Sequence, residues 1–246
     1  MRQDLYFVVI PYINREAQGD ELRYAIEGWR KHCKTPCHII VVGDVNPCFI
    51  GDPFVTYIPK SRQPEMPGQY LPHIDHVHKM MAVYERLGHK MKGFVQVADD
   101  CYAVNDFTIE DVLFPKVFAE VIPAGDINDE NGFYRDQEKT RLALVGAGLP
   151  TRNWTTHLPR YYDWEKYIDI IDQYNCGFES YIIEDLYYNT YYAGIHPYLL
   201  KEHDHYIERL ESMNTPIIGD SIWLSNSVYG WSPKLESFLK QHYEIK

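Results

Sequence analysis

Two adjacent aspartates, Asp99 and Asp100, directly follow the apolar run GFVQVA at residues 93–98. An ionised carboxylate that leaves water without a partner costs several kcal/mol, and neighbouring carboxylates also repel each other. A positive partner must therefore offset both charges if the pair ends a buried strand. Carboxylate oxygens are hard ligands that suit Mg²⁺ or Mn²⁺. The pair predicts a divalent-cation site, and an exposed turn that hydrates both side chains is the alternative.

Four apolar runs are typical of buried strands, and they lie at residues 5–13, 37–44, 54–60 and 93–98. Apolar residues at helical spacing predict a helix from residue 20 and another over residues 74–87. This alternation predicts an α/β fold with a mostly parallel central sheet flanked by helices. In such sheets ligands bind at the carboxyl ends of the strands, and the aspartate pair lies at one of these ends.

The second half of the chain carries weaker signals. Thr108 and Asp111 have the spacing of a capping box ahead of a broken helix. Three further helices are expected to begin at side-chain caps, which are Asp163, Ser180 and Ser232. Loops are expected at the Pro-rich residues 61–73 and at the polar residues 125–137. No repeat or linker interrupts the sequence, so one domain is expected over residues 1–246.

The composition narrows the range of partners and compartments. The formal net charge is −11, so a polyanion such as nucleic acid would need a local basic patch that reverses this field. The five cysteines form no C-x-x-C pair, which predicts neither a zinc framework nor a disulfide scaffold. The amino end does not read as a signal peptide, and no stretch is long enough to span a bilayer. We therefore expect a soluble, cytoplasmic protein.

The order of four segments resembles a known class of proteins. The segments are IPYINREAQGDELRYAI at residues 10–26, the strand that ends in Asp99 and Asp100, the stretch from His157 and Pro159 into DWEKYIDIIDQY, and EDLYYNTYY at residues 184–192. Together they resemble the glycosyltransferase-type proteins of bacteriophages and capsule loci. These proteins are related to nucleotide-sugar glycosyltransferases of the GT-A fold and, more distantly, to Stealth-type sugar-phosphate transferases.

The resemblance implies one Rossmann-like GT-A domain in a bacterial or phage-infected cell, with residues 1–106 binding the nucleotide and residues 107–246 facing the acceptor. The implied activity is metal-dependent hexosyl transfer from a nucleotide sugar, for which we expect a UDP-sugar, to a hydroxyl acceptor such as a glycan. Asp100 matches the direct ligand of Mn²⁺ or Mg²⁺, Asp99 supports the metal and the nucleotide sugar, and His157 completes the coordination. The family usually carries Asp-x-Asp here, whereas Ala98 offers no polar side chain at the first position.

The resemblance also assigns roles in donor binding. Asp44 follows the second strand, where an acid often accepts a hydrogen bond from uracil. Arg15 is expected to meet the diphosphate, and Lys79 is expected to reach the base or a phosphate. Each of these residues has a plainer alternative as a turn residue or a solvated charge. Arg23 is a further candidate for the diphosphate, and for it we favour the plainer alternative. The histidines of HIDHVHK at residues 73–79 lack the i,i+4 spacing of a helical metal clamp, so we expect structural or acceptor-side roles for them.

Transfer with inversion needs a general base that takes the proton of the acceptor hydroxyl. The candidates are the adjacent Glu184 and Asp185. Neighbouring helical residues diverge by about 100° around the axis, so only one of them can face the site. We favour Asp185, whereas transfer with retention would need no such base.

Three alternatives stay open. A sugar-1-phosphate transferase would use the same donor and deliver its phosphate as well. A glycosyltransferase acting on hydroxymethylated bases of phage DNA would need base flipping and a basic groove, for which the candidates are Lys34, Lys60, Arg62, Lys90 and Lys92. A non-catalytic module of the same fold is the third, and Ala98 is the feature that supports it.

Overall fold

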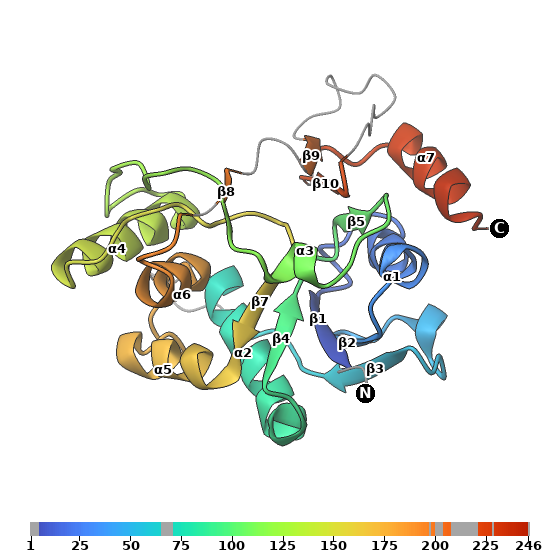
Figure 1. The fold of residues 1–246 in the computed structure, drawn as a ribbon, viewed down its shortest axis with the longest axis horizontal. Helices are drawn as coiled ribbons and strands as arrows, with labels where there is room; N and C mark the ends of the chain where they lie inside the picture. The colour runs from blue at the N-terminus through green and yellow to red at the C-terminus, as the bar shows by residue number, and fades with distance from the viewer. Residues whose placement is uncertain are drawn as a thin grey trace.

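The computed structural model describes residues 5–64, 71–196, 198–199, 204–207, 221–227 and 229–245 (Figure 1). Its central sheet contains β1 (Tyr6–Tyr12), β2 (Cys37–Gly43), β3 (Val55–Pro59), β4 (Gly93–Gln96) and β7 (Arg160–Asp163). The strand order is β3-β2-β1-β4-β7, in which the first four are parallel and β7 is antiparallel to β4. The expected α/β class with a mostly parallel sheet is confirmed.

Helices cover both faces of this sheet because side chains alternate along each strand. Val9 of β1 packs in a core with α2 (Leu71–Leu87), α5 (Trp164–Tyr174) and α6 (Ile183–Tyr191). Its neighbour Val8 packs in the opposite core with α1 (Glu21–His32). Figure 1 shows α2 and α5 on one side of β1 and β4, and α1 on the other. All four helices are therefore anchored to the strands whose ends carry the aspartate pair.

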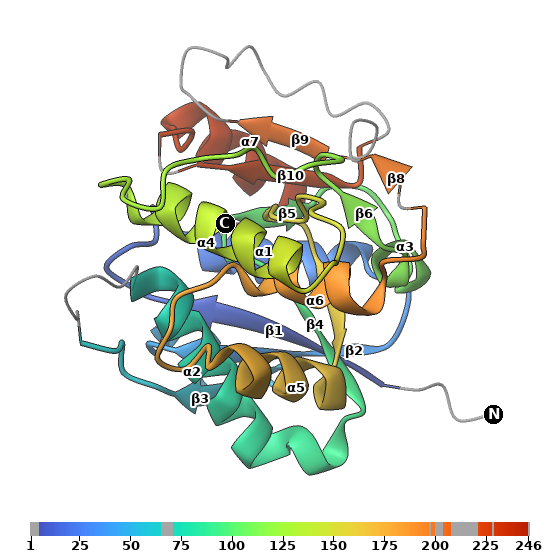
Figure 2. The ribbon, with the colours of Figure 1, turned by 90° about the vertical axis from the view of Figure 1, so that its left-hand side faces the viewer.

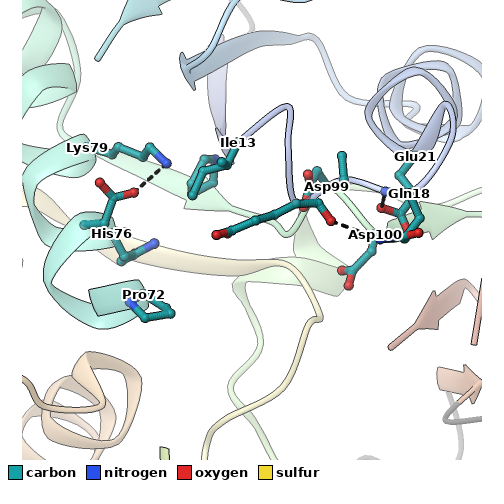
Figure 3. A pocket seen from close by; sticks show the side chains of 12 residues that line it. Ile13, Gln18, Glu21, Pro72, His76, Lys79, Asp99 and Asp100 are labelled. Atoms are coloured by element: carbon teal, nitrogen blue, oxygen red, sulfur yellow. Dashed lines mark hydrogen bonds and ion pairs between the residues drawn. The ribbon is translucent and has the colours of Figure 1, made fainter. Parts of the chain in front are cut away.

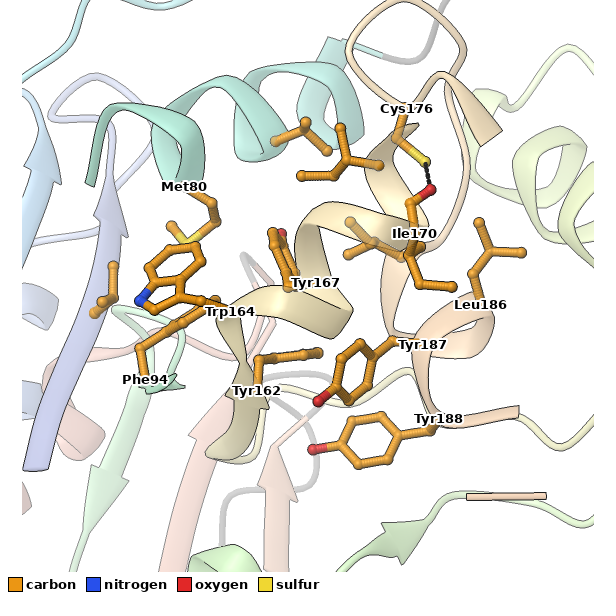
Figure 4. Packing of buried hydrophobic residues seen from close by; sticks show 14 of the residues in the cluster. Met80, Phe94, Tyr162, Trp164, Tyr167, Ile170, Cys176, Leu186, Tyr187 and Tyr188 are labelled. Carbon is orange, nitrogen blue, oxygen red and sulfur yellow. Dashed lines mark hydrogen bonds between the residues drawn. The ribbon is translucent and has the colours of Figure 1, made fainter. Parts of the chain in front are cut away.

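A group of aromatic rings lies in the core on the α2 and α5 side (Figure 4). The rings of Phe94 and Trp164 stack with their centroids 4.0 Å apart, and Tyr162 meets Tyr187 edge-on at 4.8 Å. Such pairs add to the free energy of burial, and Tyr162 and Tyr187 are both fully buried. The tyrosine pairs at 161–162 and 187–188 thus contribute to packing.

A second, three-stranded sheet lies beyond α1 and contains β5 (Cys101–Ala103), β10 (Trp223–Asn226) and β9 (Asp204–Ile207). The last helix, α7 (Pro233–Tyr243), packs on it through Leu235 and Leu239 (Figure 2). The remaining elements are η1 (Pro47–Phe49), η2 (Gly88–Lys90), α3 (Glu110–Leu113), β6 (Lys116–Val117), α4 (Gly132–Gly146) and β8 (Tyr198–Leu199). Because β5 follows Asp100 directly, this sheet fixes the far side of the aspartate turn.

Two of the three predicted helix caps are confirmed. Asp163 accepts a hydrogen bond from the backbone N–H of Glu165, and Ser232 accepts one from Leu235, each at 3.1 Å. The prediction for Ser180 is wrong, because α6 begins at Ile183 without a side-chain cap. The Ser180 hydroxyl instead donates to Asp136 at 2.5 Å.

The predicted loop at residues 125–137 is wrong in its second half, where α4 begins at Gly132 after the cap Asn131. The helix was missed because its buried face is polar and gives no apolar periodicity; this face contains Asp136, Gln137, Glu138 and Thr140. The segment after residue 106 does form a short helix, α3, and then leaves it for β6. Of the expected Pro-rich loop, residues 65–70 lie outside the described residues, and α2 begins already at Leu71. Among the described residues, no helix is both long and apolar enough to cross a bilayer.

Gly43 ends β2 with a φ of 132°, a backbone conformation that residues with a side chain rarely adopt. A Cβ there would lie 2.0 Å from the carbonyl oxygen of Tyr12 and 3.1 Å from Cε of Lys79. We expect Gly43→Ala to lower the free energy of unfolding by about 2 kcal/mol or more. Chemical denaturation checks this against Gly146→Ala, whose Cβ would meet nothing within 4 Å. Equal effects of the two substitutions would contradict the expectation.

Candidate functional site

The carboxyl edge of the five-stranded sheet carries a cavity of about 270 Å³ (Figure 3). The turn after β4 brings Asp99 and Asp100 to it, and the chain after β1 brings Ile13, residues 16–18 and the first turn of α1. The opposite wall is the first half of α2, which contributes Asp75, His76 and Lys79. The site therefore lies where parallel strands end, as the sequence predicts.

Asp100 and His157 are brought together although 57 residues separate them, with Nδ1 of His157 2.9 Å from Oδ1 of Asp100. The contact follows from the topology. Because β7 is antiparallel to β4, the residues just before β7 lie at the edge where β4 ends. The predicted proximity of this histidine to the aspartate pair is thus observed.

A third acid, Glu21, lines the same cavity and was missed from the sequence. It accepts hydrogen bonds from the backbone N–H of Gln18 at 2.6 Å and from Nδ2 of Asn226 at 2.9 Å. Asn226 lies 205 residues away, so no local pattern marks Glu21 as more than an acid in the first turn of a helix. Its low exposure of 4% is the signal that only the structure provides.

The pKa values of two of the three acids, Glu21 and Asp99, are raised. Burial raises the pKa of Glu21 to about 7. Burial also raises the pKa of Asp99, and the charges of Asp100 and Glu21 raise it further. Within the described part of the chain, no lysine or arginine forms an ion pair with any of the three, and the imidazole of His157 is the one basic side chain at ion-pair distance. The acids on this wall of the cavity therefore have no permanently charged partner.

This arrangement fits a divalent cation that is shared with a ligand. In the described residues no three His, Cys, Asp or Glu side chains are placed to hold a metal by themselves. A hard cation often binds through one or two carboxylates and takes its other oxygens from phosphates and water. Asp100 and Asp99 can supply such carboxylates, and His157 is placed to orient Asp100.

Lys79 provides the opposite charge on the far wall of the cavity. Its ammonium is 2% exposed and lies 2.6 Å from Asp75, which is equally buried. Asp75 also accepts a hydrogen bond from the backbone N–H of Gln63 at 2.7 Å, so it holds both Lys79 and the chain after β3. Figure 3 shows Lys79 and His76 opposite Asp99, Asp100 and Glu21.

Two other predicted donor-binding residues line neither cavity of the cleft. Asp44 follows β2 at the same edge, but its Oδ2 accepts a hydrogen bond from the backbone N–H of Asn14 at 2.9 Å. It thereby fixes the loop that leaves β1. Arg15 is exposed on that loop, and Arg23 pairs with Asp20 on α1. The plainer interpretation of Arg23 as a solvated helix charge agrees with this pairing.

A second cavity of about 330 Å³ adjoins the first, since His76 and Pro72 line both. Glu184 at the start of α6 faces it, together with Arg160 and Gln96. Burial alone would raise the pKa of Glu184, but the charges of His76 and Arg160 outweigh it and lower the pKa. Glu184 is therefore an ionised carboxylate at neutral pH, beside a cavity that opens next to the acids.

Asp185 points the other way, as adjacent helical residues must. It is fully buried, and its Oδ1 accepts a hydrogen bond from the backbone N–H of Trp154 at 2.5 Å. Its Oδ2 lies 3.3 Å from the hydroxyl of Thr155. The structure thus places Glu184, rather than the favoured Asp185, on the wall of a cavity.

Burial raises the pKa of Asp185 to about 7. The folded state therefore favours the protonated form, so this stabilisation is complete below about pH 4 and is lost as the pH rises through 7. We expect the unfolding free energy of the wild type, relative to Asp185→Asn, to fall between pH 4 and 7 by on the order of 1 kcal/mol per pH unit. Denaturation at several pH values checks this. The control is Asp172→Asn, at an exposed position of α5. A difference that does not change with pH would contradict it.

The histidines of α2 have structural contacts at the cleft. His73 Nδ1 lies 2.7 Å from the buried Asp136, and His76 Nε2 lies 3.0 Å from Oε1 of Gln96. His78 Nε2 lies 3.0 Å from the carbonyl oxygen of Gly177, away from both cavities. The expected structural or acceptor-side roles agree with these positions.

With this geometry in view, the chain can be compared with known proteins. No family model and no curated protein matches its sequence. Its structure is similar to the apo structure of the bifunctional glycosyltransferase WbbM, with a TM-score of 0.53 and 10% sequence identity, over 98% of this chain and 50% of that one. The chain thus spans about half the length of WbbM, and at this identity the likeness shows the fold alone. That fold is a Rossmann-like α/β domain.

Proposed function

We propose that the chain is a metal-dependent glycosyltransferase that moves a sugar from a nucleotide sugar, with UDP as the nucleotide, to a hydroxyl acceptor. The observation that supports this most is the cluster of Glu21, Asp99 and Asp100 at the carboxyl edge of the sheet without a lysine or arginine partner in the described residues. A diphosphate alone would be repelled there. A diphosphate with a divalent cation would be attracted, because the cation offsets both sets of negative charge.

Different residues of the chain would then have different roles in the proposed reaction. Asp100, oriented by His157, and Asp99 would hold Mn²⁺ or Mg²⁺, which when bound offsets the charge that develops on the departing diphosphate. Lys79 lines the same cavity, and we expect it to meet a phosphate or the base. Glu184 would accept the proton of the acceptor hydroxyl from the second cavity. Contacts of Asp44 with uracil and of Arg15 with the diphosphate stay predictions.

Every residue that lines the first cavity lies in residues 1–106, whereas residues 107–246 supply more than half of the lining of the second cavity. This division supports the proposed nucleotide-binding and acceptor-side halves within one domain. We also propose that the fold is of the GT-A type and that the chain is related to phage or capsule-locus proteins.

The DNA-modifying alternative finds no support in the positions of its basic residues. Lys60 follows the carboxyl end of β3, whereas Lys90 and Lys92 precede β4 and thus lie at the opposite edge of the parallel sheet. Arg62 pairs with Glu16, and Lys34 pairs with Asp106 at 2.8 Å. The five charges therefore form no single groove, and the acceptor we propose is a glycan or another hydroxyl compound.

The test is release of nucleotide from a panel of UDP-sugars with Mn²⁺ or Mg²⁺, with and without hydroxyl acceptors, analysed by mass spectrometry. Glycosyl transfer predicts UDP as the nucleotide product. A sugar-1-phosphate transferase would release UMP and leave an added phosphate on the acceptor. No nucleotide released from any donor would support the non-catalytic alternative and contradict the proposal.

A further inference from the structure

Arg160 is a buried cation that the proposed reaction does not use. It begins β7 and is only 7% exposed. Its Nη2 donates to the hydroxyl of Thr156 at 2.8 Å, while its Nη1 is buried without a hydrogen-bond partner in the described residues. A guanidinium stays charged across the pH range of proteins, so this burial is costly unless an acceptor meets it.

Other partly buried arginines find a partner within the protein. Arg62 pairs with Glu16, although its Nε also lacks a hydrogen bond; Arg141 is held by two oxygens of Glu138, and Arg152 donates to the carbonyl oxygen of Ile195 at 2.8 Å. For Arg160, no carboxylate lies at ion-pair distance in the part of the chain that the structure describes. The charge of Arg160 is therefore only partly compensated at short range, by the Thr156 hydroxyl and by the ring of Tyr188, whose centroid lies 6.0 Å from Cζ.

The lining of the second cavity suits an anion. Gln96 stands directly opposite Arg160 in the pairing of β4 with β7, and both line the cavity. Thr155, Thr156 and His76 add further polar groups to the wall. Glu184 is the one carboxylate among the residues that line it, and it lies beyond ion-pair distance of Arg160, so it offsets only part of the charge.

We propose that the second cavity binds an oxyanion, a carboxylate or a phosphate, through Arg160. A guanidinium binds such groups with two parallel hydrogen bonds, and Arg160 lines the cavity with only the Thr156 hydroxyl as a hydrogen-bond partner in the described residues. Because Glu184 faces the same cavity, the molecule that carries the oxyanion also presents a hydroxyl or a sugar ring to it. The chemical class is thus a uronic acid, a hydroxy acid or a sugar or polyol phosphate. Assigning this group to the acceptor or to the transferred sugar rests on the proposed function, whereas the anion site does not.

Calorimetric titration of the full chain distinguishes whether the oxyanion belongs to the acceptor or to the transferred sugar. In the acceptor arm, protein saturated with UDP and Mn²⁺ is titrated with glucuronate and glycerol 3-phosphate, and with glucose and glycerol as their neutral counterparts. In the donor arm, UDP-glucuronate is compared with UDP-glucose. We expect the anionic member to bind about tenfold tighter or more in one arm. Arg160→Gln should abolish this preference and Arg160→Lys should keep part of it.

Arg152→Gln is the matched control, because Arg152 is also a largely buried guanidinium but lines neither cavity. It should leave the preference intact. Equal affinities for anionic and neutral members in both arms of the wild type would overturn the inference, whether or not Arg160→Gln folds. A preference that survives in folded Arg160→Gln would overturn it as well. If UDP fails to bind with Mn²⁺, the proposed function is contradicted, and titrating the monosaccharides and polyols alone still tests the anion site.

Discussion

Asp100→Asn is expected to lower the metal-dependent release of UDP from a UDP-sugar by roughly 100-fold or more in kcat/KM. The substitution keeps the size of the side chain and a hydrogen-bond acceptor for His157, which lies 2.9 Å away. It removes the negative charge that would hold the cation against the diphosphate. Asp100 would hold the cation, and the cation would hold the diphosphate of the donor. We therefore expect the activity of the variant to depend less on the metal, and its KM for the donor to be higher.

Asp106→Asn is the matched control for this experiment. Asp106 pairs with Nδ1 of His32 at 3.0 Å, so it forms the same kind of carboxylate–imidazole contact, but it lines neither cavity of the cleft. Its substitution should leave kcat/KM within about twofold. Similar losses in both variants would show that Asp100 matters for stability and not for the cation.

Glu184→Gln is expected to lower kcat by about 10²–10⁴-fold while the KM for the donor changes little. Glutamine fills the same space at the wall of the second cavity but cannot accept a proton from the acceptor hydroxyl. Because the pKa of Glu184 is lowered, the carboxylate is ready to accept a proton at neutral pH. The effect should therefore lie in turnover and not in donor binding.

Glu179→Gln is the control, because Glu179 lies just before α6, is 55% exposed and pairs with Lys139 at 2.5 Å. Steady-state kinetics with a saturating acceptor separate kcat from KM. If Glu184→Gln keeps the wild-type kcat, Glu184 is not the base. Transfer would then retain configuration or use another group, and determining the anomeric configuration of the product would distinguish these.

The sequence predicts those parts of the fold that depend on local pattern. The strands β1 to β4 and the helices α1, α2, α5 and α7 are marked by apolar periodicity and by caps such as Asp163 and Ser232. The short strands β5, β9 and β10 show no such pattern, and β5 pairs with β10 across more than 100 residues. Helix α4 was missed for the same reason, since its buried face contains polar residues.

Site residues that directly follow a predicted strand could be predicted from the sequence. Site residues that are marked only by their burial could not. Asp99, Asp100 and their approach to His157 follow from motif order and sheet topology. Glu21 and Arg160 have ordinary surroundings in the sequence, and only their low exposure marks them. The orientation of two adjacent helical acids depends on helix rotation, which packing decides; the structure turns Asp185 into the core and Glu184 toward the cavity.

The most direct test of the central claim is the binding of UDP to the wild-type chain, measured by calorimetry with Mn²⁺ and again with a chelator in its place. If a cation links the acids at the end of β4 to a diphosphate, UDP should bind with Mn²⁺ at least about tenfold more tightly than without it. The same gain should be lost in Asp100→Asn and kept in Asp106→Asn. Equal UDP affinity with and without the metal, or no UDP binding in either condition, would contradict the account.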